Sequence, residues 1–260
     1  MKIGLIGGGN IGKFLLQRIN IDGLLPNSKI VGLYTRNELS AKQLADQFVT
    51  ERFSTIQSII QSNMDVIIEA ATVQVAKDIA VPVLESGKDL VLSSVGALAD
   101  LDFYQNLEKI CQEKGTKIYL PSGAIGGLDV LKAAKSIGEL QTVSILTRKP
   151  PQALPGAPED REQVLFEGTA AEAIELFPKN INVSIILSLA GLGPKHTSVK
   201  IISDPEVEKN NHTIEATGSF GKLSIQVENN PMPNNPKTSY LAALSVLSSL
   251  KNKDASILVG

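Results

Sequence analysis

The chain reads Gly7-Gly8-Gly9-Asn10-Ile11-Gly12 close to its start, and this stretch decides the first half of the fold. A short apolar segment, Lys2 to Ile6, precedes it and has the composition of a buried strand. After it, apolar residues recur at the spacing of a helix over positions 11–19. The glycine-rich stretch is therefore predicted to be the turn of a strand–turn–helix unit.

This turn fits the pattern G-x-G-x-x-G, in which each glycine has a physical role. Gly7 permits a tight turn, Gly9 lets a pyrophosphate approach the backbone, and Gly12 lets the helix pack closely on the strand. Phosphates bind there to the first amides of the helix, here at Asn10 and Ile11, where the helix dipole favours negative charge. We therefore predict a dinucleotide site; a plain glycine-rich turn is the alternative.

The segments that follow alternate between strand and helix. Strands are predicted at residues 30–34, 65–70, 90–93 and 117–120, with helices between them at residues 40–48, 73–85 and 101–113. Strands joined by crossover helices form a parallel, doubly wound sheet, the α/β Rossmann fold. Ligands bind at the carboxyl edge of such a sheet, where Ala70, Ala71 and Ser94 follow two of the strands. We assign these three residues to the cofactor site.

The end of the second strand bears on which cofactor is used, and it reads Tyr34-Thr35-Arg36-Asn37. NAD-preferring sites usually carry Asp or Glu there to bind the ribose 2′-hydroxyl, whereas an arginine can pair with a 2′-phosphate. Arg36 therefore favours NADP, or the use of both NADP and NAD. The alternative is an arginine solvated at the edge of the sheet.

After Pro121 the pattern of the sequence changes. Short strand-like and helix-like segments follow one another less regularly, and a long loop at residues 150–163 holds four prolines. A last amphipathic helix is predicted at residues 238–250. We predict a Rossmann domain made of residues 1–121 and 235–260, with an α+β domain, residues 122–234, inserted into it. Closure of the long loop over the site is a hypothesis.

Composition narrows the range of partners. The chain has 260 residues, a formal net charge of −2 and one cysteine. This charge gives no reason to expect nucleic acid or an anionic membrane surface as a partner, and no segment approaches the roughly 18 apolar residues of a membrane span. No Cys/His spacing suggests a metal site. No stretch resembles a secretory signal, so we expect a cytoplasmic protein without a metal.

Few side chains can transfer a proton near neutral pH, because the chain has two histidines. His196 is expected to be a solvated turn residue. His212 follows two asparagines at the start of a strand, and these residues alone leave it either a surface residue or a catalytic one. Asn182 lies where a helix begins, as an N-cap or as a polar group that recognises a ligand. Lys237 comes just before residues 238–239, which are expected to cap the last helix.

Several of these stretches together resemble the L-aspartate dehydrogenase family. The most specific ones are Pro121-Ser122-Gly123-Ala124-Ile125-Gly126-Gly127-Leu128-Asp129 and Pro236-Lys237-Thr238-Ser239. Further matching stretches lie at residues 7–12, 93–98, 176–183 and 210–212. The resemblance therefore covers nearly the whole chain, although many unrelated dehydrogenases share the glycine turn.

The resemblance implies NAD(P)-dependent oxidative deamination of L-aspartate to iminoaspartate, which hydrolyses to oxaloacetate and ammonia or feeds NAD biosynthesis. It implies that His212 is the catalytic histidine and that Ala124 and Asn182 contact the nicotinamide end of the cofactor. A neutral His212 would accept a proton from the substrate ammonium or from the attacking water, an effect of roughly 10²–10⁴-fold. The family plan also implies a homodimer, with an inserted domain for substrate binding and dimerisation.

The two carboxylates of aspartate need cationic or amide partners, and the candidates are Lys149, Lys237 and the Ser122-Gly123-Ala124 backbone. Arg36 departs from the acidic residue of NAD-preferring members, so the resemblance leaves NAD and NADP both open. Two alternatives differ in function. One is another two-domain amino-acid or semialdehyde dehydrogenase, and the other is a non-catalytic NADP-binding sensor in which His212 is dispensable.

Overall fold

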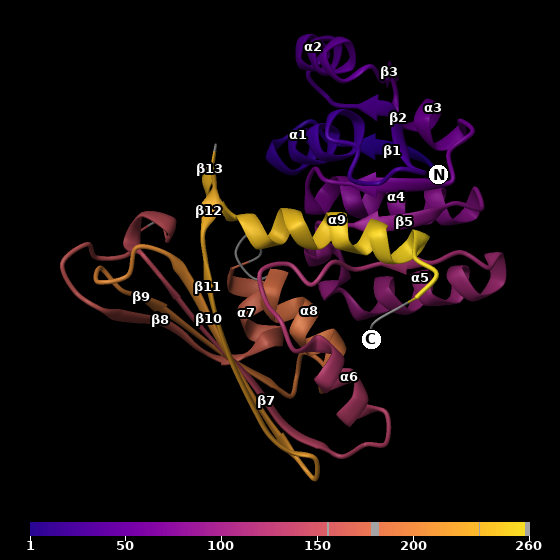
Figure 1. The fold of residues 1–260 in the computed structure, drawn as a ribbon. Coiled ribbons are helices and arrows are strands. Elements are labelled where there is room, and N and C mark those ends of the chain that lie inside the picture. The colour runs from indigo at the N-terminus through magenta and orange to yellow at the C-terminus, as the bar shows by residue number, and fades with distance from the viewer. Residues whose placement is uncertain (155, 178–181, 234, 258–260) are drawn as a thin grey trace. The chain divides into compact units, whose positions relative to one another are not determined.

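The computed structural model describes residues 1–154, 156–177, 182–233 and 235–257. The chain divides into two compact units (Figure 1). Among the described residues, the first comprises Met1–Pro121 together with residues 246–257, and the second comprises Ser122–Ser245.

The first unit is built on a parallel sheet with the strand order β3-β2-β1-β4-β5-β6. Its strands are β1 (Lys2–Ile6), β2 (Lys29–Tyr34), β3 (Glu51–Arg52), β4 (Val66–Glu69), β5 (Asp89–Leu92) and β6 (Ile118–Tyr119). This is the order of a dinucleotide-binding sheet, and it reverses between β1 and β4, where such sheets bind their ligands. The predicted Rossmann fold is confirmed.

Crossover helices connect these strands and pack on the sheet (Figure 1). They are α1 (Asn10–Leu16), α2 (Glu38–Phe48), α3 (Ile56–Gln61), α4 (Val73–Glu85) and α5 (Leu101–Lys114). A π-helical stretch, Gln17–Ile21, extends α1. The short strand β3 and helix α3 have no counterpart among the predicted ranges.

The last helix, α9 (Tyr240–Asp254), contributes its second half to the first unit. Val246 and Leu250 are buried in the same hydrophobic cluster as Leu5 of β1. Near the end of the helix, the Lys253 ammonium pairs with the Asp89 carboxylate at the start of β5. The second half of α9 is therefore part of the core that supports the first sheet.

The second unit is built on a mixed sheet with the strand order β11-β10-β7-β9-β8. Its strands are β7 (Leu140–Lys149), β8 (Gln163–Thr169), β9 (Thr197–Ser203), β10 (Asn210–Gly218) and β11 (Gly221–Asn229). β7 and β9 are parallel, and the other neighbours are antiparallel. Helices α6 (Leu128–Lys135), α7 (Ala170–Leu176) and α8 (Asn182–Ala190) lie along one face, here called the inner face (Figure 1).

The last helix begins two residues later than predicted. Thr238 and Ser239, the residues expected to cap it, directly precede it and belong to strand β13 (Asn235–Ser239), which pairs with β12 (Pro231–Met232). The helix begins at Tyr240, whose amide donates to the Asn230 carbonyl at 2.8 Å.

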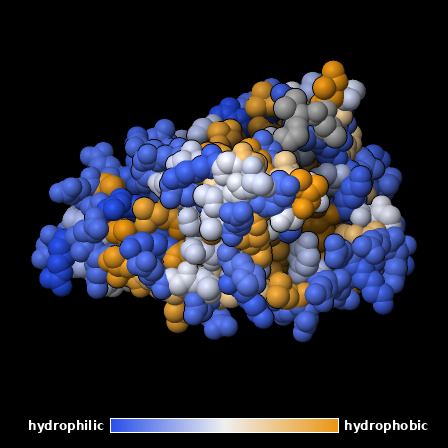
Figure 2. Space-filling view, turned by 90° about the horizontal axis from the view of Figure 1, so that it is seen from below, coloured by the Kyte–Doolittle hydropathy of each residue, from blue (hydrophilic) through white to orange (hydrophobic). Residues whose placement is uncertain are grey.

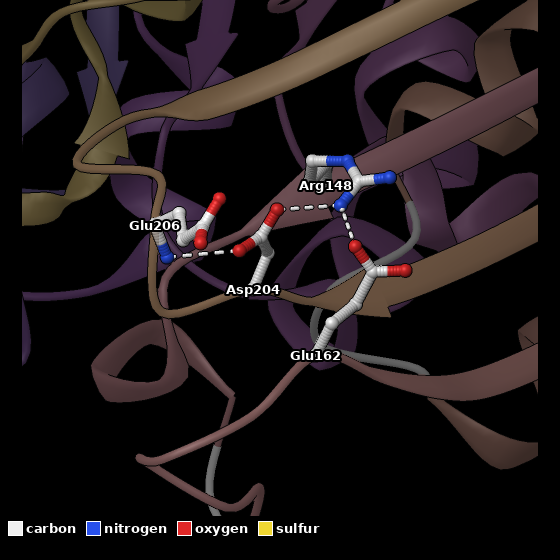
Figure 3. A network of polar contacts seen from close by, with 4 residues as sticks. All are labelled: Arg148, Glu162, Asp204 and Glu206. Atoms are coloured by element: carbon white, nitrogen blue, oxygen red, sulfur yellow. Dashed lines mark hydrogen bonds and ion pairs between the residues drawn. The ribbon is translucent and has the colours of Figure 1, made fainter.

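The long segment after β7 is less irregular than its prolines suggest. It contains a short 3₁₀ turn, Pro151–Ala153, and Leu154 is 3% exposed. The Arg148 guanidinium lies between the Glu162 and Asp204 carboxylates and pairs with both (Figure 3). These ion pairs join the end of β7 to the residue before β8 and to the residue after β9.

The described helices include none with the length and apolar character that crossing a membrane requires. On the face seen in Figure 2, hydrophobic residues lie in small groups among hydrophilic ones. Such scatter is common on protein surfaces and does not by itself mark an interface.

Candidate functional site

The glycine turn between β1 and α1 has the tight packing that its sequence predicts. A Cβ at Gly7 would lie 2.2 Å from the Ala70 carbonyl oxygen, and the φ of Gly7 is +122°. A Cβ at Gly12 would lie 2.1 Å from the Gly7 carbonyl oxygen. Gly9 differs, because no described heavy atom lies within 4 Å of a Cβ built there. Close packing thus explains Gly7 and Gly12, whereas Gly9 faces open space.

The open space at Gly9 fits a dinucleotide phosphate. Asn10 and Ile11 begin α1, and no described side chain caps the amides of its first turn. The first amides of a helix have no acceptor within the helix, and a phosphate at the positive end of the helix dipole supplies one. The residues present therefore fit the pyrophosphate of NAD or NADP.

The carboxyl ends of β4 and β5 are joined by a buried carboxylate that sequence reasoning missed. Glu69 is fully buried, and its Oε1 accepts from the Ala71 amide at 2.7 Å and from the Ser94 hydroxyl at 2.9 Å. Its Oε2 accepts from the Ser94 amide at 2.8 Å. Burial raises the pKa of Glu69, while these hydrogen bonds act in the opposite direction. Ala70, Ala71 and Ser94 are thus held together at the ligand-binding edge of the sheet.

Arg36 follows β2 at the same edge, and its side chain is exposed. The next residue, Asn37, caps α2 by accepting from the Ser40 amide at 2.9 Å. The position agrees with a 2′-phosphate partner and with a solvated arginine, so the structure leaves both interpretations open.

The inner face of the second sheet changes from apolar to polar toward one end. Strand register places neighbouring side chains in rows that run across β11, β10, β7 and β9. The apolar row holds Ile225, Ile214, Ile145 and Val199. The next row holds Val227, His212, Thr147 and Ile201. Beyond this row, Asn229 pairs with Asn210 and Lys149 pairs with Ser203; these four residues are here called the polar row.

His212 is buried, at 3% exposure, and its Nδ1 lies 3.0 Å from the Thr147 hydroxyl. Burial, and to a smaller extent the nearby Lys149 charge, lower the pKa of His212 to about 3. The imidazole is therefore neutral at neutral pH. When Nδ1 donates to Thr147, Nε2 carries the lone pair that can accept a proton.

Lys149 is 8% exposed, and burial lowers the pKa of its ammonium. It lies two residues beyond Thr147 on β7, so its side chain is on the same face of the sheet as His212. No ion pair to Lys149 occurs among the residues that the structure describes. A cation and a proton acceptor are therefore neighbours in a buried setting.

The loop between β6 and α6 meets the polar row. Asn229 donates through Nδ2 to the Ala124 carbonyl at 3.0 Å, and the Gly123 amide donates to the Ser245 hydroxyl at 3.1 Å. Ser122, just before them, is half-buried. Ala124 and the polar row are thus in contact within one unit.

The remaining predicted residues are placed less completely. Asn182 is the first residue of α8 and is exposed, while the next residue, Val183, is 4.0 Å from a Cβ built at Gly123. Lys237 belongs to β13, but its side chain lies outside the described part of the chain. The structure therefore brings Ala124, Lys149 and His212 together on one unit.

Three polar residues escaped sequence reasoning: Glu69, Ser203 and Asn229. Glu69 was included in an apolar run, and Asn229 in a segment that was interpreted as a loop. Their roles depend on which strands are neighbours, and the local sequence does not contain that information. The sequence holds one signal for Glu69, because an acidic residue there ends the apolar run Val-Ile-Ile of a strand expected to be buried.

The fold and the glycine turn define a nicotinamide-dependent dehydrogenase with two units. In agreement, residues 7–121 match the family model "Homoserine dehydrogenase, NAD binding domain", and residues 129–253 match "Aspartate dehydrogenase, C-terminal". The predicted cofactor, NAD or NADP, is confirmed at this level.

Full-length relatives identify the family. The chain is 40% identical over 275 residues to the L-aspartate dehydrogenase of Methanosarcina barkeri, with 100% of this chain and 99% of that protein covered. It is 39% identical to the L-aspartate dehydrogenase of Methanocaldococcus jannaschii, again with 100% of this chain and 99% of that protein covered. The crystal structure of aspartate dehydrogenase from Thermotoga maritima matches with a TM-score of 0.82 at 29% identity, covering 100% and 99% of the two chains. The chain belongs to the L-aspartate dehydrogenase family.

Proposed function

We propose that this chain catalyses the NAD(P)-dependent oxidative deamination of L-aspartate. A bound nicotinamide dinucleotide supplies the acceptor for the hydride that leaves the substrate Cα. The substrate ammonium loses a proton as the imine forms, and water then adds to the imine to release ammonia and oxaloacetate. The observation that carries the proposal is the buried, neutral His212 beside Lys149 in a chain of this family.

His212 is the proposed proton acceptor, from the ammonium or from the attacking water. Burial disfavours the imidazolium in the free enzyme, whereas a dicarboxylic substrate brings negative charge that favours it. His212 therefore becomes a stronger base when the substrate binds. Thr147 holds the ring in one orientation through Nδ1, which leaves the other nitrogen for proton transfer.

Ala124 and Asn182 are proposed to contact the nicotinamide end of the cofactor. Support for Ala124 comes from its carbonyl, which Asn229 fixes at the polar row. Lys149, Lys237 and the Ser122–Ala124 backbone stay the candidate partners for the two substrate carboxylates. On the first unit, Gly7, Gly9, Asn10, Ile11, Gly12, Arg36, Ala70, Ala71 and Ser94 are proposed to line the cofactor site.

A panel of assays tests the activity. Aspartate, glutamate and homoserine are each incubated with NAD and with NADP, and oxaloacetate with ammonia is used for the reverse direction. We expect aspartate-dependent reduction of the cofactor and, because of Arg36, activity with NADP. Cofactor binding without turnover of any dicarboxylic amino acid would favour the sensor, and turnover of homoserine alone would favour a related dehydrogenase.

The two histidines provide a matched pair for the mechanism. His212→Ala is expected to lower kcat by about 10²–10⁴-fold, whereas His196→Ala, at an exposed position, should leave kcat unchanged. A His212→Ala enzyme with full activity would exclude the proposed base.

The assembly and cellular context are also proposals. We propose a homodimer whose interface lies on the second unit, as the family resemblance implies, and sedimentation at several protein concentrations tests it. A cytoplasmic location and a contribution of iminoaspartate to NAD biosynthesis are expectations of the same kind.

A further inference from the structure

The polar row contains buried groups whose hydrogen-bonding capacity is unused. The Ser203 hydroxyl oxygen and Asn229 Oδ1 are buried and have no hydrogen-bond partner among the described residues. Buried polar atoms in native proteins are almost always paired, and an unpaired one calls for an explanation such as a ligand. Both orphaned atoms belong to the polar row with Lys149. Lys149 makes no ion pair with any residue that the structure describes.

Lys149 and Ser203 are direct neighbours, because they are paired in the register of β7 and β9. Neighbouring strands lie about 4.8 Å apart, so one small group can touch an ammonium and a hydroxyl that project from adjacent positions. Both groups are donors. The nearest acidic neighbour along the chain, Asp204, pairs with Arg148 instead (Figure 3). Two donors, one of them a lysine ammonium, are thus neighbours in the sheet, and no described carboxylate pairs with the lysine.

Asn229 differs from Lys149 and Ser203, because its orphaned atom is a hydrogen-bond acceptor and theirs are donors. Its amide nitrogen donates to the Ala124 carbonyl, and this contact directs Oδ1, an acceptor, away from the loop. An acceptor does not bind an anion, so Asn229 lies outside the donor pair and positions the loop.

We propose that Lys149 and Ser203 form an anion subsite that binds one carboxylate of the dicarboxylic amino acid. This inference rests on the proposed function and deepens it, because it selects Lys149 among the open candidates and adds Ser203. It also gives a reason for a lysine at a buried position. An unpaired buried cation destabilises the free protein, and the substrate carboxylate provides its missing partner.

Binding of succinate tests the subsite without turnover. Succinate has two carboxylates and no amino group, and its affinity is measured by titration calorimetry on the full-length enzyme saturated with NADPH or NADH. Lys149→Met is expected to weaken succinate binding about 10- to 100-fold, since charge-assisted hydrogen bonds are the strong ones. Ser203→Ala should weaken it about 3- to 10-fold. The control is Lys200→Met, because Lys200 is on the same strand as Ser203, faces the other side and pairs with Glu167.

Thermal unfolding supplies a readout that a merely structural lysine would not give. Met has a similar volume and no charge, so Lys149→Met is expected to raise the Tm by about 2–4 °C while it removes affinity. A lower Tm together with unchanged succinate binding would overturn the subsite. Ser203→Ala keeps the test valid if the lysine variant does not fold.

Two further arms separate the possible outcomes. If Lys149 binds the side-chain carboxylate, its replacement will reduce the preference for aspartate over asparagine. If it binds the α-carboxylate, kcat/KM for both will fall together; either result supports the subsite. Wild-type enzyme that binds succinate through Lys149 without deaminating aspartate would contradict the proposed function alone. Normal turnover with succinate binding that is unaffected in both variants would contradict the subsite alone.

Discussion

The glycines of the first turn show how one motif combines two physical requirements. Gly7 and Gly12 are demanded by the protein's own backbone, since an added Cβ would overlap a carbonyl oxygen in each case. Gly9 has an ordinary φ of −75° and open space around it, so the fold does not demand a glycine there. The motif alone predicts a ligand, and the structure distinguishes Gly7 and Gly12, which packing requires, from Gly9, which packing does not require.

This difference predicts opposite effects for two identical substitutions. Gly9→Ala should leave the free energy of unfolding within about 0.5 kcal/mol of wild type, as expected for a surface change, but weaken NADPH binding about tenfold because the methyl group occupies space proposed for the pyrophosphate. Gly12→Ala should destabilise the fold by about 1–3 kcal/mol through overpacking. Urea unfolding and fluorescence titration of NADPH measure both. Equal NADPH affinity in Gly9→Ala and wild type would contradict the phosphate position.

The sequence around His212 does not show whether this histidine is a surface residue or a catalytic one. The two roles differ in the burial of the side chain, and His212 is buried because β10 lies between β7 and β11. The same pairing places Thr147 at its Nδ1 and Lys149 nearby. A single sequence does not give the register between strands that are far apart along the chain. Thr147 and His212 are 65 positions apart, so the polar row could not be predicted.

At the scale of elements, the long periodic segments were predictable and the short ones were not. The strands and helices of the first sheet carry apolar runs that only one architecture buries. β3 spans two residues and α3 spans six, which is too short for periodicity to be visible. The β12–β13 hairpin was missed for another reason, because its prolines and asparagines have low strand propensity and pairing between the two strands overrides it.

The Arg148 ion pairs fix the segment that leads from β7 to β8. Arg148 contacts Glu162 and Asp204 (Figure 3), and the Asp204 pKa is lowered by the Glu206 amide and by Arg148. Arg148→Met is expected to increase the rate of proteolysis within residues 150–162 several-fold, with a change in global stability of about 1 kcal/mol or less, since these pairs are partly exposed.

Lys222→Met is the matched control, because it removes an exposed ion pair, with Glu215, from the same sheet. Its cleavage pattern should equal that of wild type. If Arg148→Met is cleaved in residues 150–162 no faster than this control, the ion pairs do not restrain the segment. Mass spectrometry of the early fragments identifies the cleavage positions.

At the scale of the whole molecule, the groups proposed to take part in the chemistry are divided between the two units. The first supplies a glycine turn, a sheet edge held by Glu69 and open space for phosphates. The second has a buried histidine and, in the polar row, two buried polar atoms without a hydrogen-bond partner among the described residues. Such atoms lower the stability of their own unit, since they give up hydration without gaining partners. Stability and function are therefore expected to oppose one another in the second unit.

The cost of the buried histidine to stability can be measured through the dependence of stability on pH. The pKa of His212 is about 3 in the folded protein, against 6.5 in the unfolded chain. Above pH 6.5 neither state binds the proton, so the full stability is present. As the pH falls below 6.5, the unfolded chain takes up the proton while the folded protein does not, and stability is lost progressively down to about pH 3. At pH 5 this single group should account for a loss of about 2 kcal/mol relative to pH 8.

His212→Asn should remove that part of the loss, whereas His196→Asn, at an exposed position, should retain it. Urea unfolding of the three proteins at pH 5 and pH 8 decides the matter, and equal losses in wild type and His212→Asn would show that the imidazole takes up its proton as readily in the folded protein as in the unfolded chain.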